Sequence, residues 1–528
     1  MTFDSKELDI ESGAAVSKGD DGDDTTGRKV PVYSDDIHPY NEPKSLKIYH
    51  HTMRMFHGET RGVDRVPEEE KTHSSVMGPT TLWFAINMVI AAYALGALSY
   101  PVFNLDFGSS VLTVVFFNIL GALPVAFFSI FGARFGLRQM VMSRFLIGNV
   151  GMRIFALFNC VACVGWAAVN TMSSAQLLHI VNNGALPPWA GCVIVIALTI
   201  FVSFFGYNLI HAYERWSWIP NTICFIAIIA RFAMAHVFKA GIQNADGEWV
   251  TWGSGPTLAG NILSFGGAVF GYSAGWATYA ADYTTYMRSK TSSWKIFLGV
   301  FAGVVVSLSF TEILGAACIT GIKTSSTYAK LYDEYSVGGL IYAILVQDSL
   351  HGFGQFLCVL LALSTVCNNI PNMYSIALGV QSMWSQFAKV PRVVWTVIGN
   401  GLILAICIPG YYDFAEVVDN FMNLIGYYIA IYISVSLTEH FVFRRGFSAY
   451  HPEDYKDITK LNPGYAGAFS FFCGVAGAVL GMNQTWYQGV LASKIGADSG
   501  DIGFEVASGF SFVSYLISRS IELKYFGR

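Results

Sequence analysis

Charged residues are scarce in this chain. Asp, Glu, Lys and Arg make up 13% of its 528 residues, whereas 53% are hydrophobic and the mean hydropathy is +0.46. Soluble domains carry about 25% charged residues, so a soluble core could not bury this much apolar surface. The composition predicts a polytopic membrane protein. The net charge of −4 comes largely from an N-terminal tail that includes GDDGDD at 19–24, and no basic patch indicates a nucleic-acid partner.

Motifs that would indicate catalysis or a metal centre are also missing. The sequence has neither an HExxH zinc motif nor a plausible Ser/His/Asp set, and His211 and Glu214 stand three residues apart without a further ligand. Its nine cysteines lie singly in apolar segments, as Cys160 and Cys407 do, and are interpreted as small buried hydrophobes. We therefore expect no enzyme, no metal and no cofactor.

The first 75 or so residues are polar and contain no apolar core of a signal peptide. Their composition predicts a disordered cytoplasmic tail over 1–79, whose lysines and serines permit binding of ubiquitin or the trafficking machinery. We assign 80–522 to a transmembrane transporter domain and 523–528 to a cytoplasmic C-terminus.

Long apolar runs recur from Thr80 to the end of the chain. A helix that rises 1.5 Å per residue needs about 20 such residues to cross a bilayer. Twelve runs of about this length are present: 81–103, 109–132, 152–181, 187–207, 215–238, 258–281, 296–320, 353–384, 391–410, 417–440, 464–483 and 504–522. Twelve helices with almost no soluble domain predict an all-α polytopic transporter that is embedded in the lipid bilayer.

Basic residues concentrate in alternate loops. One set of loops contains Arg134, Arg138, Arg144, Arg215, Arg288, Lys290, Lys295, Lys389, Arg392, Arg444, Arg445, Lys456 and Lys460. The opposite loops contain only Lys239, Lys323, Lys330 and Lys494. Because cytoplasmic loops carry the excess of Lys and Arg, both termini are predicted in the cytoplasm.

Glycine and proline interrupt the first and sixth runs. The first, AAYALGALSYP, has Gly96 and Pro101 as predicted weak points. The sixth, FGGAVFGYSAGWATYA, carries Gly266, Gly267, Gly271 and Gly275. Interrupted helices at corresponding positions indicate an inverted-repeat transporter with its site at the membrane midplane, here with repeats at about 80–240 and 256–440 and extra helices at 464–522. The alternative is that these glycines only let helices pack closely.

Polar and aromatic side chains within three runs predict the kind of solute. Trp166 and Asn170 share one face of the third run because residues i and i+4 are neighbours on a helix. Trp276 follows the glycines of the sixth run. The eighth run, LALSTVCNNIPNMY, places five polar residues around Pro371: Ser364, Thr365, Asn368, Asn369 and Asn372. Because proline removes a backbone donor, we expect the helix to open there and leave carbonyls free.

A flat, neutral heterocycle fits this set of side chains. Indole faces can sandwich a base ring, and an amide offers a donor and an acceptor side by side, matching the edge of adenine or cytosine. A phosphate or a charged amino acid would demand fixed charge, of which these runs offer little. The alternative is that Trp166 packs and the asparagines bond between helices, at roughly 0.6 kcal/mol each. Stacking and amide groups from three runs together favour the ligand site.

Several long motifs carry a family resemblance. They include GWAAVNT, FFGYNLIHAYERWSW, GWATYAADYTTYM, IYAILVQDSLHGFGQF, LALSTVCNNIPNMYSIAL, KVPRVVWTVIGN and GYYIAIYISVSLTEHFVFRRGFSAY. From about Met77 to the terminal ELKYFGR, the chain resembles the fungal purine-cytosine permeases of the nucleobase-cation symporter-1 family. The resemblance implies the LeuT-type fold, with a five-plus-five inverted repeat plus two C-terminal helices. It also implies import of cytosine, adenine, guanine or hypoxanthine with protons across the plasma membrane, by alternating access.

The resemblance also assigns roles to individual residues. Trp166 and Trp276 match the two aromatics that stack on the base, and Asn170 matches the residue that hydrogen-bonds it. The specificity-determining stretch is matched by Asn368, Asn369 and Asn372. Ser364 and Thr365 match hydroxyls that complete a cation site in sodium-coupled relatives and are expected here as its vestige. By this resemblance, family members read IASYALG where this chain reads IAAYALG, so Ala92 replaces a hydroxyl near the presumed break of the first run and is counted among the substrate-binding positions.

Coupling to protons requires a group that titrates within the transport path. Glu214, in HAYERWSW at the start of the fifth run, is the leading candidate, and an ion pair with Arg215 is the alternative. Asp282, at the end of the sixth run, is expected to cap a helix or latch the inner gate. Glu312 and Arg231 also lie within apolar runs, where either could form a structural pair. An alternative function is a non-transporting nucleobase sensor derived from a permease.

Overall fold

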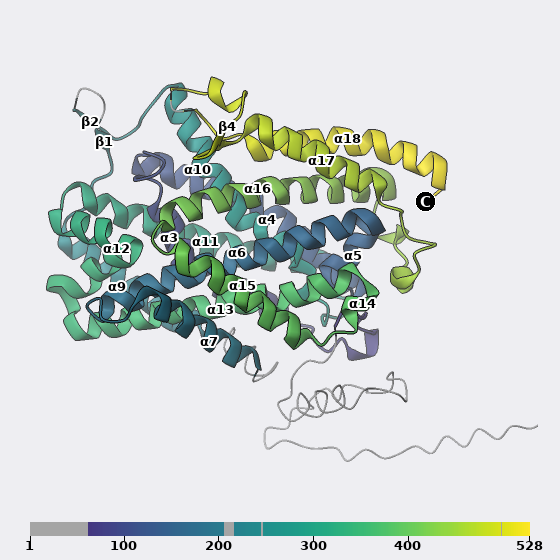
Figure 1. The fold of residues 1–528 in the computed structure, drawn as a ribbon, viewed down its shortest axis with the longest axis horizontal. Coiled ribbons are helices and arrows are strands. Elements are labelled where there is room, and N and C mark those ends of the chain that lie inside the picture. The colour runs from purple at the N-terminus through teal and green to yellow at the C-terminus, as the bar shows by residue number, and fades with distance from the viewer. Residues whose placement is uncertain (1–61, 205–215, 244–246, 498) are drawn as a thin grey trace, which may run out of the picture. The chain divides into compact units, whose positions relative to one another are not determined.

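The computed structural model describes residues 62–204, 216–243, 247–497 and 499–528, all of which belong to one compact unit, Pro43–Arg528. This part of the chain is built from helices (Figure 1). Its strands form two short antiparallel ribbons: β1 (Ile242–Gln243) pairs with β2 (Trp249–Val250), and β3 (Asn483–Gln484) pairs with β4 (Tyr487–Gln488).

Each of the predicted apolar runs contains at least one helix. The corresponding helices are α2 (Met77–Asn87) with α3 (Ile90–Ala97), α4 (Phe107–Phe135), α6 (Asn149–Val181), α7 (Pro188–Phe204), α9 (Trp218–Ala235), α10 (Pro256–Ala274), α11 (Ser293–Ile319), α13 (His351–Met383), α15 (Arg392–Gly410), α16 (Phe414–Thr438), α17 (Tyr465–Gly481) and α18 (Gly503–Phe526). Among the described residues, seven helical segments are long and apolar enough to cross a membrane by themselves, and the bent pair α2 and α3 adds an eighth. The all-α membrane fold is thereby confirmed, while the count of twelve spans stays a prediction.

The remaining elements flank or connect these helices. They are α5 (Gln139–Leu146), α12 (Ser326–Leu345), α14 (Ser385–Ala388) and the 3-10 or π turns η1 (Glu68–Glu70), η2 (Gly275–Thr278), η3 (Ala280–Tyr283), η4 (Thr320–Lys323), η5 (Val346–Leu350), η6 (Glu439–Arg444), η7 (Phe447–Ala449), η8 (Pro452–Lys456) and η9 (Ala492–Lys494). The sequence analysis missed α5 and α12. A search for apolar runs of membrane length overlooks a helix of eight residues, and it also overlooks α12, which begins with the polar stretch STYAKLYDEY.

The first membrane span breaks at a different place from the one predicted. The 54° bend lies between α2 and α3, where Val89 is extended at φ −135° and ψ 161°. Gly96, by contrast, lies inside α3, where an added Cβ would collide with the backbone of Glu312, and Pro101 follows the end of α3. Gly96 therefore serves close helix packing, which was the alternative interpretation, and the break occurs in a stretch without glycine or proline.

The sixth span is interrupted at a predicted glycine. Regular α10 ends at Ala274, and the chain continues through η2, which begins at Gly275. The expectation for the eighth span was wrong, because α13 continues through Pro371 as one helix of 33 residues instead of opening there. Among the described residues, the first and sixth predicted spans are therefore both discontinuous.

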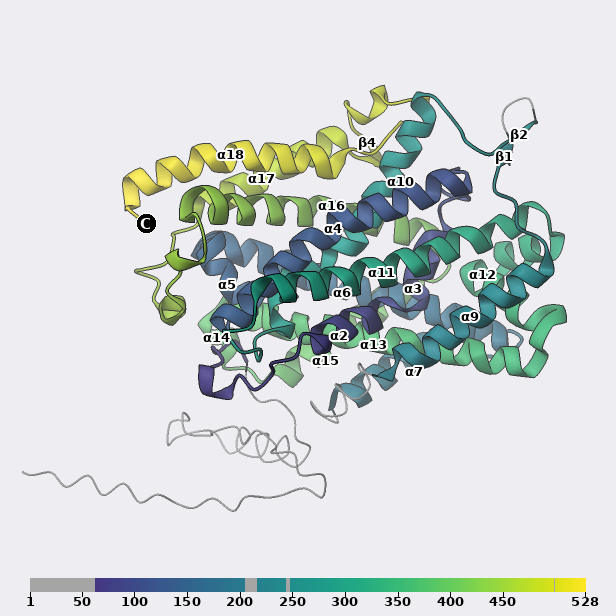
Figure 2. The same cartoon turned by 180° about the vertical axis from the view of Figure 1, so that it is seen from behind.

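Helices far apart in the sequence form the core. α6 packs along α13, while α4 packs against both α10 and α11. The two C-terminal helices, α17 and α18, lie side by side and contact α16, as both views show (Figures 1 and 2). The discontinuous first span, α2 and α3, packs against α13, and α3 also packs against α6.

Segments with many predicted cytoplasmic charges contact one another. Lys456 of η8 forms an ion pair with Asp64 at 2.6 Å. The backbone N–H of Ser289, in the loop after η3, donates to Glu68 Oε1 at 3.0 Å. The start of the described chain and two loops from its second half therefore meet on one side of the helices.

Candidate functional site

The third and eighth predicted spans are joined by a cluster of amides. Asn170 Nδ2 on α6 donates to Asn368 Oδ1 at 2.7 Å and to Asn369 Oδ1 at 2.9 Å, both on α13. Asn369 returns a hydrogen bond from its Nδ2 to Thr171 Oγ1 at 3.3 Å. The Oδ1 atom of Asn170 is buried and has no hydrogen-bond partner among the described residues. One acceptor in the cluster is therefore left for a group from outside the chain.

Trp276 lies just beyond the interruption of the sixth span. Its Nε1 donates to Asn87 Oδ1 at 3.0 Å, and Asn87 is the last residue of α2. Its ring meets Trp83 edge to face, with centroids 5.4 Å apart, and Tyr279 at 5.5 Å. The indole is consequently held by both discontinuous helices.

Trp166 lies on α6, on the same face as Asn170. Its ring packs edge to face on Tyr272 of α10, with centroids 4.7 Å apart, and on Phe421 of α16 at 5.7 Å. A Cβ added to Gly275 would lie 3.1 Å from the Trp166 ring. The absence of a side chain at Gly275 therefore lets the interrupted helix approach this indole closely.

The predicted stacking and amide residues are closed off from solvent. Trp166 is 4% exposed and Trp276 is 3% exposed, while Asn170, Asn368 and Asn369 are at most 1% exposed. An unpaired polar group in such surroundings costs about 1–3 kcal/mol. The free acceptor on Asn170 is thus an energetic cost in this conformation, and a bound solute that donates a hydrogen bond would relieve it.

The remaining residues of the eighth span bond to the discontinuous helices. Asn372 Oδ1 accepts from the Tyr279 hydroxyl at 3.1 Å, and Asn372 Nδ2 donates to the carbonyl of Asn368. Asn368 Nδ2 in turn donates to the carbonyl of Ile86 at 2.6 Å. Ile86 precedes the break between α2 and α3, so α13 supplies a donor at the point where helical hydrogen bonding stops.

The expected vestige of a cation site also lies at this break. Ser364 Oγ accepts from the backbone N–H of Ile90 at 3.3 Å. Thr365 Oγ1 lies 2.6 Å from Ser174 Oγ. Asn221 Nδ2, from α9, donates to the carbonyl of Met88 at 3.0 Å. The oxygens that would coordinate a cation here therefore already accept hydrogen bonds. The Ser364 hydroxyl accepts from a backbone N–H, and the carbonyls of Ile86 and Met88 accept from the side-chain amides of Asn368 and Asn221.

Two of the other predicted residues lie at neighbouring elements, and one lies outside the described residues. Ala92 is fully buried in α3, two residues beyond Ile90. Asp282 Oδ1 accepts from the backbone N–H of Gln139 at 2.7 Å, and Gln139 is the first residue of α5, so this carboxylate occupies a helix-capping position. Glu214 lies outside the described residues.

Sequence analysis missed four residues that complete this region. They are Trp83, Asn87, Asn221 and Tyr279. Asn87 and Asn221 carried a usable signal, because an amide within an apolar run needs a partner. Trp83 and Tyr279 carried none, since aromatic residues are frequent throughout the chain, at 15% of all residues. The aromatic and amide groups of this region therefore come from five predicted spans, whereas sequence analysis took them from three.

The chemistry of the region is that of uncharged hydrogen bonding and aromatic contact. Among the described residues, no group of three or more His, Cys, Asp or Glu side chains could hold a metal ion. Amides, hydroxyls and indole rings suit a neutral planar ligand, since they offer paired donors and acceptors beside apolar faces.

Comparison with known proteins agrees with this chemistry. Residues 65–501 match the family described as permeases for cytosine/purines, uracil, thiamine and allantoin. The chain is 52% identical over 491 residues to the purine-cytosine permease FCY2 of Saccharomyces cerevisiae, covering 92% of this chain and 90% of that protein. It is 45% identical over 471 residues to the purine-cytosine permease fcyB of Emericella nidulans, covering 89% and 90%.

The fold also matches a solved transporter structure. Mhp1, a nucleobase-cation-symport-1 family transporter in a closed conformation with bromovinylhydantoin bound, superposes with a TM-score of 0.62 at 15% identity, covering 89% of this chain and 96% of Mhp1. The likeness confirms the predicted LeuT-type fold. Given this fold and the extent of the sequence match, the chain belongs to the cytosine/purine permease family of multi-pass membrane transporters.

Proposed function

We propose that this permease imports cytosine, adenine, guanine and hypoxanthine across the plasma membrane by proton symport. The observation that carries the proposal is the amide cluster of Asn170, Asn368 and Asn369, with its one free buried acceptor. The exocyclic amine or ring N–H of a base would donate to Asn170 Oδ1. The purine-cytosine permeases that this chain resembles support the choice of substrates.

The proposed binding mode combines stacking and hydrogen bonding. The base lies against Trp166 and Trp276. Trp166 approaches the interrupted sixth span from α6, and Trp276 lies within that span, in η2. Asn369 and Asn372 hydrogen-bond the remaining polar edge of the base. Ala92 leaves the site without the hydroxyl that the family resemblance implies at this position. Base stacking on aromatic rings contributes about 1–3 kcal/mol per base.

Transport follows an alternating-access cycle. The outward-open carrier binds base and proton, closes around them and opens inward, with the interrupted spans as the moving parts. Only a ligand with different affinities for the two states can drive such a change. Asp282, whose carboxylate caps α5, holds the inner gate of the carrier closed. Glu214 is the proton-coupling candidate that the sequence suggests.

The proposed orientation has both termini in the cytoplasm. The contacts that join Asp64 to Lys456 and Glu68 to Ser289 support it, because they put segments with many basic residues on one side of the helices. The N-terminal tail would then be accessible to ubiquitin and to the trafficking machinery.

Uptake in a fungal host without nucleobase permeases of its own tests the proposal. Radiolabelled cytosine, adenine and hypoxanthine would be supplied at acidic and at neutral pH, to cells that express either the wild type or Asn170→Ala. Saturable uptake that is faster at acidic pH and lost in the variant is expected. Binding of base without uptake, at normal surface expression, would identify the sensor instead.

A further inference from the structure

A buried carboxyl–amide pair with unpaired oxygens lies outside the base site. Glu312, in the outer half of α11, is fully buried, and its Oε2 accepts from Asn118 Nδ2 on α4 at 2.6 Å. Its Oε1 has no hydrogen-bond partner among the described residues. Asn118 is also fully buried, and its Oδ1 is likewise without a partner in this part of the chain. Neither base recognition nor the helix breaks use this pair.

The groups that face Glu312 offer no positive charge. Asn118 comes from α4, and the backbone of α3 packs on Glu312 at Gly96. Tyr272 of α10 is the titratable side chain that interacts with Glu312 across the packing, and its hydroxyl has no hydrogen-bond partner among the described residues. Tyr93 of α3, another titratable group on a neighbouring element, is directed at Cys318 instead.

The cations on neighbouring elements are engaged elsewhere. Arg231 on α9 donates to Ser349 at 2.6 Å, and Arg134 at the far end of α4 donates to Ser293. Sequence analysis left the partners of Glu312 and Arg231 open, and the structure gives Glu312 the amide of Asn118 and Arg231 the hydroxyl of Ser349. An ionised carboxylate that is buried without a counter-ion is strongly disfavoured. These surroundings favour the protonated form of the Glu312 carboxyl over the ionised form.

Asn118 can serve both protonation states of this carboxyl. An amide has a donor nitrogen and an acceptor oxygen on one planar group. Its Nδ2 donates to Glu312 Oε2, a bond that either protonation state accepts, and after a half-turn of the amide its Oδ1 accepts the proton of the neutral acid. Since both Asn118 Oδ1 and Glu312 Oε1 are free, this exchange needs no other side chain to move.

Two short connections join Glu312 to the base site. The carbonyl of Asn118 accepts from Ser273 Oγ at 3.1 Å, and Ser273 lies two residues before Gly275, which contacts the Trp166 ring. Tyr272, the residue before Ser273, packs its ring edge to face on Trp166 at 4.7 Å. The end of α10 thus lies between the carboxyl and the indole.

We propose that Glu312 is the carboxyl that binds the coupled proton during base transport. A proton from the outer solution adds to a Glu312 carboxylate oxygen when the base binds, forming the neutral acid of the closed state, and returns to water on the inner side after the base leaves. Neutralisation lets α3, α4, α10 and α11 close around the group, so the loaded carrier is favoured over the carrier with base alone. This inference rests on the proposed proton symport.

The test is Glu312→Gln, which keeps the side-chain volume and a hydrogen bond to Asn118 but removes the titration. Asp419→Asn is the matched control, because Asp419 also accepts from an asparagine amide, Asn423 Nδ2 at 3.0 Å, but this bond lies within α16 and does not join it to α4 or α10. Glu214→Gln is the competing candidate. Each variant would be assayed for surface expression, accumulation of labelled base, alkalinisation of the medium on base addition, and exchange of labelled for unlabelled base.

For Glu312→Gln we expect base exchange to continue while accumulation and alkalinisation are lost. The ratio of uptake at pH 5 to uptake at pH 7.5 should fall to about one, since no titrating group remains in the cycle. Asp419→Asn should behave like the wild type. Glu312→Asp, which keeps an ionisable group at a changed distance, should retain coupling with a displaced pH profile, an effect that a packing role would not produce.

Two outcomes would overturn the inference. If Glu312→Gln accumulates base with the pH profile of the wild type, or if only Glu214→Gln loses coupling, Glu312 is not the coupling group and proton symport stands. If the wild type neither accumulates base nor alkalinises the medium, the symport proposal fails and this inference fails with it. Should Glu312→Gln not reach the surface, the pH profile of Glu312→Asp decides, and an unchanged profile would refute the role.

Discussion

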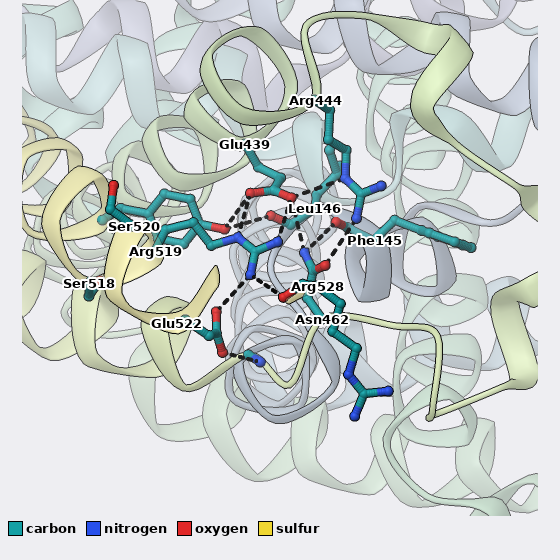
Figure 3. A network of polar contacts seen from close by, with 12 residues as sticks. Phe145, Leu146, Glu439, Arg444, Asn462, Ser518, Arg519, Ser520, Glu522 and Arg528 are labelled. Carbon is teal, nitrogen blue, oxygen red and sulfur yellow. Dashed lines mark hydrogen bonds and ion pairs between the residues drawn. The ribbon is translucent and has the colours of Figure 1, made fainter. Parts of the chain in front are cut away.

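Two buried carboxyls in this protein have opposite surroundings. Glu439, at the end of α16, is met by Arg444 at 3.0 Å and by Arg519 at 3.0 Å, and it also accepts from Asn462 and Tyr515 (Figure 3). Glu312 has one neutral partner and a free oxygen. Two guanidinium groups give the Glu439 carboxyl oppositely charged partners that hold its neighbours together, whereas Asn118 gives Glu312 a neutral partner.

The Glu439 network also explains how the C-terminal helices are attached. Arg519 lies on α18 and donates to Glu439 on η6, and it also pairs with Glu522 at 3.1 Å. Glu522 accepts from the backbone N–H of Gly464, just before α17. The charges of this network, which are satisfied within the chain, fix helices to one another. We expect its disruption to affect stability more than substrate affinity.

The largest expected effect is on the ion network. Arg519→Met leaves Glu439 with one guanidinium partner, and breaking a buried pair in this way costs about 3–5 kcal/mol. Thermal unfolding of the detergent-purified permease should shift to clearly lower temperature. Lys460→Ala, which removes an exposed pair with Asp454, is the control and should change stability by less than about 1 kcal/mol. Equal shifts for the two variants would contradict the structural role.

A smaller effect is expected in the base site. Asn170→Ala removes the donor to Asn368 and Asn369 and the free acceptor for the base, at about 1–3 kcal/mol per unpaired group. The KM for uptake should rise roughly 10-fold to 100-fold, since 1.4 kcal/mol corresponds to a factor of ten.

Asn159→Ala is the matched control for that experiment. Asn159 also lies on α6 and donates to a residue of α13, Ser375 at 3.2 Å, but it does not contact the amide cluster. Its substitution should lower thermal stability with little change in KM. A loss of affinity as large as that of Asn170→Ala would mean that α6–α13 packing, rather than the amide cluster, determines base binding.

Restoring the family hydroxyl should have a modest effect. In Ala92→Ser the new hydroxyl adds one hydrogen bond near the first break, worth about 0.5–1.5 kcal/mol. The KM for cytosine should change by no more than about tenfold, and competition assays with adenine would reveal whether specificity shifts. Ala91→Ser, its neighbour on α3, controls for the added polarity. An identical response from both variants would exclude a specific role for position 92.

The smallest expected effect is that of sodium. The hydroxyl of Ser364 and the carbonyls of Ile86 and Met88 already take part in hydrogen bonds, two of them with amides from Asn368 and Asn221. Uptake in sodium-free medium, with choline as the replacement cation, should therefore equal uptake in sodium medium at the same pH. A requirement for sodium would mean that these amides move aside for a cation.

The sequence predicted the helices of this fold well because the bilayer imposes a simple demand. Every spanning segment must be apolar and must satisfy its own backbone hydrogen bonds, so helix positions can be read from composition alone. The same reasoning found Trp166, Asn170 and the asparagines of α13, because polar groups within apolar runs stand out. It missed Trp83 and Tyr279, whose residue types are common in every span.

The breaks were harder to predict than the helices. Gly96 is a plausible weak point by its backbone freedom, but the bend occurs at Val89, where no residue is intrinsically flexible. Pro371 removes a helical hydrogen bond, but α13 continues through it. The position of a break depends on the side chains that other helices offer to the freed backbone groups, and here Asn221, Ser364 and Asn368 offer them.

The sequence by itself therefore determined the membrane-embedded helical class, the approximate position of each helix and the amides and indoles that make up the candidate site. Only the tertiary structure decided which of these polar groups are satisfied. Asn368 has its partners on α6 and before the first break, Glu439 has its partners on η6 and α18, and Glu312 has a single neutral one. Apart from the Glu439–Arg444 pair, these contacts join residues 80 to 282 positions apart, so their pairing is set by helix packing and not by any local pattern.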